Sequence, residues 1–198
     1  MPYKTLFPGQ EPNEKIILIL RKHGWVFLKI VFFYLVLSLL PWLAHYLIQQ
    51  YTELLAAGTL TIILNLLTSI YYIYILTFFF RAWIDYYFDV GVITNERIVD
   101  IEQNGLFSRN ISALRLYRVQ DVASQVRGFL PTLLHFGTVS VQTAGSVPRF
   151  IFDEIANPYE TSKNILELVQ QKKHKMIAMG INPDLEEEEE INENVANT

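Results

Sequence analysis

Residues with the chemistry of catalysis or metal binding are few and scattered in this sequence. The chain has no cysteine, and its four histidines, His23, His45, His135 and His174, are far apart. No two of them have the i, i+4 spacing that places a pair of imidazoles on one helix face as metal ligands. The sequence also has no glycine-rich phosphate loop and no G-x-S-x-G nucleophile motif. These absences predict no catalytic residue, no metal site and no cofactor.

Asp85 and Asp89 are a pair of carboxylates that would share one face of a strand. Paired carboxylates can act as general acid and general base. The alternation of polar and apolar residues around them explains both better as members of a solvated face, because successive side chains of a strand point to opposite faces. We therefore assign them no catalytic role.

Arginines are the best candidates for a ligand-binding surface. Arg97, Arg109, Arg118 and Arg127 are the candidates for contact with lipid phosphates. The charge balance argues against this function, because residues 83–170 contain seven basic and ten acidic residues and no lysine cluster of the kind that binds anionic lipid. The same balance argues against nucleic acid as a partner. Scattered arginines on strands are more often solvated or paired with neighbouring acids.

Two long stretches without formal charge organise the chain. Twenty-three residues separate Lys29 from Glu53, and 27 more separate Glu53 from Arg81. A helix rises about 1.5 Å per residue, so either stretch exceeds the roughly 30 Å hydrocarbon core of a bilayer. Both are apolar on nearly all sides, without the polar stripe of a helix at the surface of a soluble protein. We predict transmembrane helices over residues 24–48 and 58–82, joined by an external loop at residues 49–57.

The distribution of charge predicts the orientation of this helical hairpin. Four basic residues precede the first span and Arg81 ends the second, whereas the loop between them has a single charged residue, Glu53. The positive-inside rule then places both termini and the C-terminal domain in the cytoplasm of a multi-pass plasma-membrane protein. Within the hairpin, Asn65, Thr68 and Ser69 are predicted to form hydrogen bonds to the other helix.

The periodicity changes from helical to strand-like after the second span. Ile84, Tyr86 and Phe88 alternate with more polar neighbours, which is the pattern of a half-buried strand. Asn104-Gly105 predicts a tight hairpin turn. Seven antiparallel strands are expected, at residues 84–92, 97–103, 106–110, 112–117, 119–126, 137–143 and 149–154, with a turn at Gly145-Ser146 before the last.

One amphipathic helix is expected after the strands and completes a domain at residues 83–175. Asn157 is predicted as its N-cap, Pro158 as its first residue and Glu160 as the third residue after the cap. Apolar residues at 165, 168 and 169 would share its buried face. The basic residues at 172–175 would lie at its negative C-terminal end.

The two ends of the chain are predicted to lie outside this domain. Residues 1–23 are expected to form a cytoplasmic segment, with residues 16–20 lying along the membrane interface. Residues 181–198 carry seven acids and no base, so the net charge of −4 becomes −4 + 7 = +3 without them. Residues 176–198 are predicted to be disordered, because their like charges repel one another and they have little apolar surface to bury.

Four short motifs accompany this order of elements. They are Val92-Ile93-Thr94-Asn95-Glu96-Arg97-Ile98, Gly105-Leu106-Phe107-Ser108-Arg109, Leu116-Tyr117-Arg118-Val119-Gln120-Asp121-Val122 and Phe136-Gly137-Thr138-Val139-Ser140-Val141. With these motifs the chain resembles the bacterial pleckstrin-homology-like (PH-like) family of small membrane proteins, over roughly residues 14–172. The resemblance implies a split β-barrel of about seven antiparallel strands capped by a C-terminal helix, at the inner face of a prokaryotic plasma membrane, with no settled biochemical activity.

The segment at residues 128–136 is apolar for a connection between strands. Its large apolar residues are Phe129, Leu130, Leu133 and Leu134. One interpretation is a buried plug that closes an end of the barrel, which is favoured because large apolar side chains are mostly buried. The other is a tip that contacts the membrane, since the domain follows the second span directly.

These observations favour a non-enzymatic scaffold that is anchored in the membrane by two spans. Its strand edges or grooves would bind a protein partner, whose identity the sequence does not reveal. A module that senses lipid headgroups with the strand arginines is the alternative. An enzyme is disfavoured because the sequence has no recognisable catalytic site. A transporter is disfavoured because neither span holds an acid or a base at mid-depth.

Overall fold

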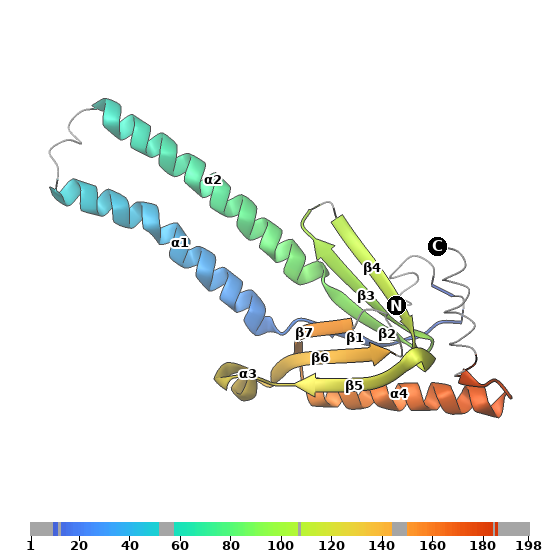
Figure 1. Ribbon diagram of the computed structural model, residues 1–198. Coiled ribbons are helices and arrows are strands. Elements are labelled where there is room, and N and C mark those ends of the chain that lie inside the picture. The colour runs from blue at the N-terminus through green and yellow to red at the C-terminus, as the bar shows by residue number, and fades with distance from the viewer. Residues whose placement is uncertain are drawn as a thin grey trace. The chain divides into compact units, whose positions relative to one another are not determined.

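The computed structural model describes residues 10–11, 13–51, 58–106, 108–143, 150–183 and 185 (Figure 1). The chain divides into two compact units. Unit 1 contains Met1–His23, Asp89–Glu102 and Asn110–Thr198, and unit 2 contains Gly24–Phe88 and Gln103–Arg109. Most of the predicted external loop, the Gly145-Ser146 turn and the acidic run at residues 186–190 lie outside the described residues.

Unit 2 contains two long helices, α1 (Gly24–Tyr51) and α2 (Gly58–Phe88). Their most apolar parts are Gly24–Ile48 and Thr61–Phe88, with mean hydropathies of 2.2 and 1.9. Only 6% of the most apolar stretch of each helix is buried. A core helix of a soluble protein would be mostly buried instead. By length and composition both helices are therefore compatible with membrane spans.

The helix α1 continues through Pro41, and a side chain of α2 replaces the hydrogen bond that this proline cannot donate. Proline has no backbone N–H, so the carbonyl of Leu37, four residues earlier, loses its donor within the helix. The Tyr71 hydroxyl on α2 donates to this carbonyl oxygen at 3.0 Å. Tyr71 therefore satisfies the acceptor that Pro41 frees. In a bilayer this hydrogen bond would be important, because no water could replace the missing donor.

A second tyrosine, Tyr72, donates to the Ser38 carbonyl of α1 at 2.9 Å. The Ser69 hydroxyl instead donates to the Asn65 carbonyl of its own helix at 2.9 Å. The prediction that Ser69 bonds to the other helix is therefore wrong. Serine has a short side chain that reaches its own preceding turn, whereas the tyrosine hydroxyl lies far enough from its backbone to reach the neighbouring helix.

Tyr71→Phe should weaken the helical hairpin by about 1 kcal/mol, because it leaves the Leu37 carbonyl without a donor. Tyr72→Phe should cost less, since its acceptor Ser38 lies four residues before Trp42, which has a backbone N–H. In a Pro41→Ala background the restored N–H should reduce the cost of Tyr71→Phe. Unfolding of the full chain in mixed detergent micelles measures the loss of stability for Tyr71→Phe, for Tyr72→Phe and for Tyr71→Phe in the Pro41→Ala background. Equal costs for both tyrosines, with no rescue, would contradict the assignment.

The end of α2 differs from the prediction, because the helix continues to Phe88 rather than giving way to a strand at Ile84. Alternation over five residues is too short to exclude a helix. Extending an existing helix also adds a hydrogen bond per residue without a new nucleation cost. Arg81 and Asp85 lie 3.8 Å apart at i, i+4 spacing, as helical neighbours do. Asp85 and Asp89 therefore do not share a strand face.

Unit 1 contains most of a β-structure of two antiparallel sheets, with strand orders β1-β2-β3-β4 and β5-β6-β7. A helix, α4, packs against β5 and β6 (Figure 1). Seven strands in two sheets with a C-terminal helix form the predicted PH-like fold. The elements are β1 (Ile16–Arg21), β2 (Val90–Thr94), β3 (Arg97–Asn104), β4 (Ser108–Arg115), the 3₁₀ turn η2 (Leu116–Arg118), β5 (Val119–Gln125), α3 (Phe129–Leu134), β6 (Phe136–Thr143), β7 (Phe150–Ala156) and α4 (Pro158–Ala178).

The strand β1 replaces the predicted interfacial segment at residues 16–20. It pairs antiparallel with β2, with Leu18 opposite Ile93 and Leu20 opposite Gly91. Leu20 is 3% exposed and belongs to the core. A short apolar run does not by itself distinguish a strand from an interfacial helix, and the partner strand is more than 65 residues away in the sequence. The helical hairpin is thus inserted in the sequence between two paired strands.

Two further local predictions are corrected. The predicted strands at residues 106–110 and 112–117 form one strand, β4. Helix α4 begins at Pro158 as predicted, but the Asn157 side chain makes no capping hydrogen bond. Asn157 instead has a left-handed backbone with φ of 49°, and its N–H donates to the His135 carbonyl at 2.8 Å.

The core of the β-structure is formed by both sheets and α4. Ile93 and Ile98 from the first sheet, Val139 and Val141 from the second, and Ile165 from α4 are all fully buried, with 0% exposure. Val169 of α4 is also buried and Leu168 is partly buried. The predicted apolar face of this helix is therefore confirmed.

Candidate functional site

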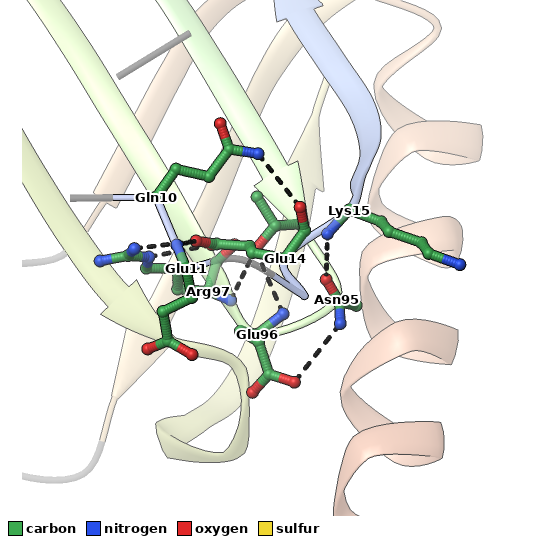
Figure 2. Close-up of polar contacts among 8 residues, drawn as sticks. Gln10, Glu11, Glu14, Lys15, Asn95, Glu96 and Arg97 are labelled. Atoms are coloured by element: carbon green, nitrogen blue, oxygen red, sulfur yellow. Dashed lines mark hydrogen bonds and ion pairs between the residues drawn. The ribbon is translucent and has the colours of Figure 1, made fainter. Parts of the chain in front are cut away.

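The first predicted ligand residue, Arg97, lies in a buried ion pair with Glu14 (Figure 2). Its Nη2 and Nε donate to the two carboxylate oxygens of Glu14, at 2.8 and 2.9 Å, and the Glu14 side chain is 0% exposed. The Thr94 hydroxyl donates to Glu14 Oε1 at 2.7 Å. Such a two-point pair occupies the donors that a phosphate would need.

The environment keeps this pair ionised. Burial would raise the pKa of Glu14, but hydrogen bonds from Arg97, Thr94 and the Glu11 backbone outweigh burial and lower the pKa below its usual value. The hydrogen bond to Glu14 in turn raises the pKa of Arg97. We conclude that Arg97 fastens the segment before β1 to the β2–β3 turn.

Other contacts support the same attachment (Figure 2). The Lys15 N–H donates to Asn95 Oδ1 at 2.6 Å, and the Asn95 N–H donates to the Lys15 carbonyl at 3.1 Å. Glu96 forms an ion pair with Lys172 of α4. The β2–β3 turn is therefore bound both to the N-terminal segment and to the C-terminal helix.

The remaining predicted arginines do not form one phosphate site. Arg109 is exposed, and Arg118 and Arg127 both belong to unit 1. Arg118 precedes β5 and Arg127 follows it, so a seven-residue strand separates them. At about 3.3 Å per residue this strand is roughly 23 Å long, which is too far for one headgroup to bridge. The Gln125 amide, oriented with its oxygen toward Arg127, accepts from Nε at 3.2 Å and from Nη2 at 3.1 Å.

The apolar segment forms the short helix α3, and none of its residues is buried. Phe129 is 81% exposed, Leu133 60% and Leu130 42%, and Leu134 is half-buried. The interpretation as a barrel plug is therefore wrong. We call Phe129, Leu130 and Leu133 the apolar tip. A cluster of exposed large apolar side chains is typical of an interaction site rather than of an ordinary loop.

A second feature is an open pocket of about 310 Å³ between the β4–η2 connection and the end of α4, here called the basic groove. Three of its lining residues are basic and one is acidic. Met176, Met179 and Ile181 give it an apolar wall. The lining residues are Glu96, Arg115, Tyr117, Lys172, Lys175, Met176, Met179 and Ile181.

Sequence reasoning did not find this groove. Arg115 is not among the four arginines predicted to bind a ligand, and the basic residues at 172–175, which include Lys172 and Lys175, are predicted only as cations at a helix end. The i, i+3 spacing of the two lysines does indicate that they share one helix face. Only the fold brings that face beside Arg115.

A third feature is an acidic cavity of about 140 Å³ between β1–β3 and β7. Its acidic residues are Asp89, Asp100, Glu102 and Asp153, and Lys22 pairs with Asp89 at 2.6 Å. Burial, with the charges of Glu102 and Asp89, raises the pKa of Asp100 to about 6. Among the residues that the structure describes, no group of three or more His, Cys, Asp or Glu side chains has a geometry that could hold a metal ion.

Asp100→Asn should raise the stability of unit 1 at pH 7.5 but not at pH 4. Because its pKa is raised to about 6, folded Asp100 keeps its proton in a pH range where the unfolded chain has lost it. The stability that protonation provides is present below about pH 4 and is lost as the pH rises through 6. We expect a gain of about 1 kcal/mol at pH 7.5 after discounting for solvent screening. Thermal unfolding of the variant and the wild type at pH 4 and pH 7.5 measures this gain in stability. A gain that is the same at both pH values would contradict the prediction.

Comparisons with known proteins do not assign this chain to a family. No family model matches the sequence, and no curated protein matches it. A solved structure that is similar is a DUF1696 family protein with a pleckstrin-homology domain from Shewanella loihica PV-4. The match has 13% sequence identity and a TM-score of 0.34, and covers 41% of this chain and 70% of that one. We infer no activity from it, and the PH-like description rests on the strand order given above.

Proposed function

We propose that this protein is a non-enzymatic, membrane-anchored PH-like module that presents a protein-binding surface at the cytoplasmic face of a prokaryotic membrane. The observation that carries the proposal is the exposed strand β4. It is the last strand of its sheet, and residues 108–113 are all exposed, so neither face of this part is covered. A terminal strand has backbone N–H and C=O groups on its outer edge, with which an extended segment of a partner can pair.

The two apolar helices support anchoring in a bilayer, and the distribution of charge supports the orientation. The basic residues that flank the spans favour a cytoplasmic location of both termini. Stable anchoring by two spans removes the need for a peripheral lipid site. Unit 1 would then be held at the membrane whatever its own affinity for lipid.

A cysteine-labelling experiment tests this orientation. The chain has no cysteine, so single replacements give specific labels. We expect Thr52→Cys to react with a membrane-impermeant maleimide in intact cells, and Ser108→Cys to react only after the membrane is permeabilised. The opposite pattern would mean that the domain lies outside the cell.

Lipid-headgroup sensing by the strand arginines is the alternative function. The Glu14 contacts of Arg97 and the separation of Arg118 from Arg127 argue against it. The apolar tip is a better candidate for contact with lipid, because burial of exposed large apolar side chains in the interface is favourable. Such contact would depend on apolar area rather than on a particular headgroup.

Photo-cross-linking in intact membranes tests the proposal. A benzophenone amino acid would replace Ile111 on β4, Leu133 in the apolar tip, or Lys163 on the exposed face of α4 as a control. We expect a discrete protein adduct from position 111 that Ser112→Pro abolishes, because proline has no backbone N–H and is poorly accommodated in a paired strand. Lipid adducts are expected from position 133. No protein adduct from 111 together with lipid adducts dependent on Arg118 or Arg127 would favour lipid sensing.

A further inference from the structure

The inner face of the first sheet changes from apolar to acidic within a few residues of β3. Ile98 is a fully buried core residue, and Asp100 and Glu102 follow it at intervals of two along the strand. Residues two apart in a strand point to the same face. The acidic cavity that Asp100 and Glu102 line also contains Asp89 and Asp153. Because a carboxylate is costly to bury unless it is paired or protonated, packing alone does not explain this cluster.

Gly91 provides the space in which Asp100 is enclosed. It lies opposite Leu20 of β1 and opposite Asp100 of β3. A Cβ atom on Gly91 would lie 2.7 Å from Cε1 of Phe152 on β7 and 3.2 Å from Cβ of Leu20. The missing side chain therefore lets β7 approach the first sheet closely. Asp100 is half-buried at this point, and the residue opposite it has no side chain with which it could pair.

A lysine at the same cavity joins the two points between which the helices are inserted. Among the described residues that line the cavity there is one lysine, Lys22, against four carboxylic acids. Its Nζ lies 2.6 Å from Oδ2 of Asp89. Arg21 is opposite Val90 in the β1–β2 ladder, so Lys22 and Asp89 continue that register by one residue pair. Lys22 lies two residues before α1 begins, and Asp89 directly follows α2.

The end of β1 also contacts the second sheet. Lys22 forms an isolated antiparallel bridge with Ile155, and the His23 N–H donates to the Glu154 carbonyl at 2.7 Å. All of these residues belong to unit 1. We call the Lys22–Asp89 ion pair together with the His23–Glu154 hydrogen bond the clasp. It holds the end of β1 to β2 on one side and to β7 on the other.

We propose that a proton on Asp100 controls the clasp, which stays closed when Asp100 is protonated and opens more often when Asp100 is ionised. With Asp100 neutral, Lys22 of β1 faces the charges of Asp89 before β2, Glu102 of β3 and Asp153 of β7. Ionisation adds a fourth negative charge, which repels the other carboxylates and competes for Lys22. The inference goes beyond the proposed function, because it concerns the attachment of β1 and not the binding of a partner.

The pKa of Asp100 gives the direction of this control. Burial and the charges of Glu102 and Asp89 raise it to about 6, against the smaller opposing effects of the Ile101 backbone and Lys22. When the clasp opens and water enters, the pKa should return toward the usual value of about 3.9. A proton therefore binds the closed state more tightly and shifts the equilibrium toward it. The stabilisation of the closed state is complete below about pH 4 and is lost as the pH rises through 6.

These two pKa values also give the size of the effect. They predict that the ratio of open to closed clasp rises about tenfold between pH 5 and pH 7.5. Asp100 is only half-buried, so we expect about threefold after discounting for solvent screening.

Hydrogen exchange in the full chain in detergent micelles tests this proposal. The reporter is the His23 amide, which donates across the clasp. The reference is the Asn95 amide, which donates to the Lys15 carbonyl at 3.1 Å near the other end of β1. Exchange rates at pH 5 and pH 7.5, divided by the intrinsic rate at each pH, give the ratio of open to closed states. We expect this ratio to rise by about threefold or more for His23 and to stay nearly constant for Asn95.

Three substitutions separate the clasp from other effects of pH. Asp100→Asn keeps the size of the side chain without its charge, so at both pH values His23 should show the low opening of the wild type at pH 5. Asp121→Asn removes an exposed carboxylate of β5 outside the cavity and should leave the rise at His23 unchanged. Lys22→Gln removes the ion pair, so opening at pH 5 should reach at least the wild-type level at pH 7.5.

Three results would overturn the proposal. They are equal changes at His23 and Asn95, a rise at His23 that persists in Asp100→Asn, and unchanged exchange of His23 in Lys22→Gln at pH 5. Thermal unfolding verifies that each variant is folded. If Lys22→Gln does not fold, the comparison of Asp100→Asn with Asp121→Asn still decides, because both remove one carboxylate and only one of them lies at the clasp.

Discussion

Glu14→Gln should destabilise the β-structure by about 3 kcal/mol. The substitution keeps the side-chain volume but removes the charge that Arg97 binds through two hydrogen bonds. Breaking a buried pair by removing one partner costs about 3–5 kcal/mol, because the remaining charge is left uncompensated. Since Arg97 keeps some access to solvent, with 23% side-chain exposure, we expect the lower end of that range.

A surface ion pair provides the matched control. Lys163 and Glu167 lie 3.9 Å apart on the exposed face of α4. Glu167→Gln should cost no more than about 0.5 kcal/mol, because exposed pairs are screened by water. Hydrogen exchange of β1, β2 and β3 in the full chain measures the local free energy of opening. Equal losses for Glu14→Gln and Glu167→Gln would contradict a structural role for the buried pair.

The same variant should change the acid sensitivity of the protein. The pKa of Glu14 is lowered in the folded state, so in acid the unfolded chain takes up a proton before the folded chain does. The stabilisation by the pair is complete above the usual glutamate pKa of about 4.3, and is lost as the pH falls through the folded value. In Glu14→Gln the free energy of unfolding should therefore fall less than in the wild type as the pH is lowered below about 4.3. The contribution of Asp100 to stability depends on pH in the opposite direction, because its pKa is raised and its stabilisation is lost as the pH rises.

Gly137→Ala should be nearly as damaging, with a cost of about 3 kcal/mol. A Cβ atom at this position would lie 2.4 Å from the Gln125 carbonyl oxygen and 3.0 Å from Val126 Cγ2. The first of these is a backbone atom of β5, so relief requires a shift of a paired strand rather than a side-chain rotation. Overpacking in a tight site costs about 1–3 kcal/mol, and a backbone obstacle favours the upper end.

Gly24→Ala is the control for this substitution. No heavy atom lies within 4 Å of the position that its Cβ would take, at the start of α1. Alanine also has a higher helix propensity than glycine by up to about 1 kcal/mol. Thermal unfolding of unit 1 in the full chain compares the two. A loss at Gly137 no larger than that at Gly24 would mean that the strands adjust freely at this point.

The elements that sequence analysis predicted well have local causes. The two charge-free stretches are long enough to identify α1 and α2, and Pro158 marks the start of α4. The strands β3, β5, β6 and β7 are predicted by short-range alternation and turn residues. In each case the determining physics lies within a few residues of the element.

The errors arise where a distant partner decides the structure. Residues 16–20 become a strand because β2 is available to pair with them. Arg97 is unavailable for phosphate because Glu14, 83 residues earlier, occupies its guanidinium. The basic groove exists because Arg115 and α4 meet in space. No local pattern at these residues identifies their partners.

The insertion of the helical hairpin between β1 and β2 has a consequence for biosynthesis. During translation β1 is made first, but its partner β2 emerges only after both long helices have been synthesised. The first sheet therefore cannot be completed until the hairpin has brought its two ends together. A fragment that begins after α2 would lack β1 and leave one edge of β2 unpaired. A soluble version of the domain should instead be made by internal deletion, with a short turn that joins His23 directly to Asp89.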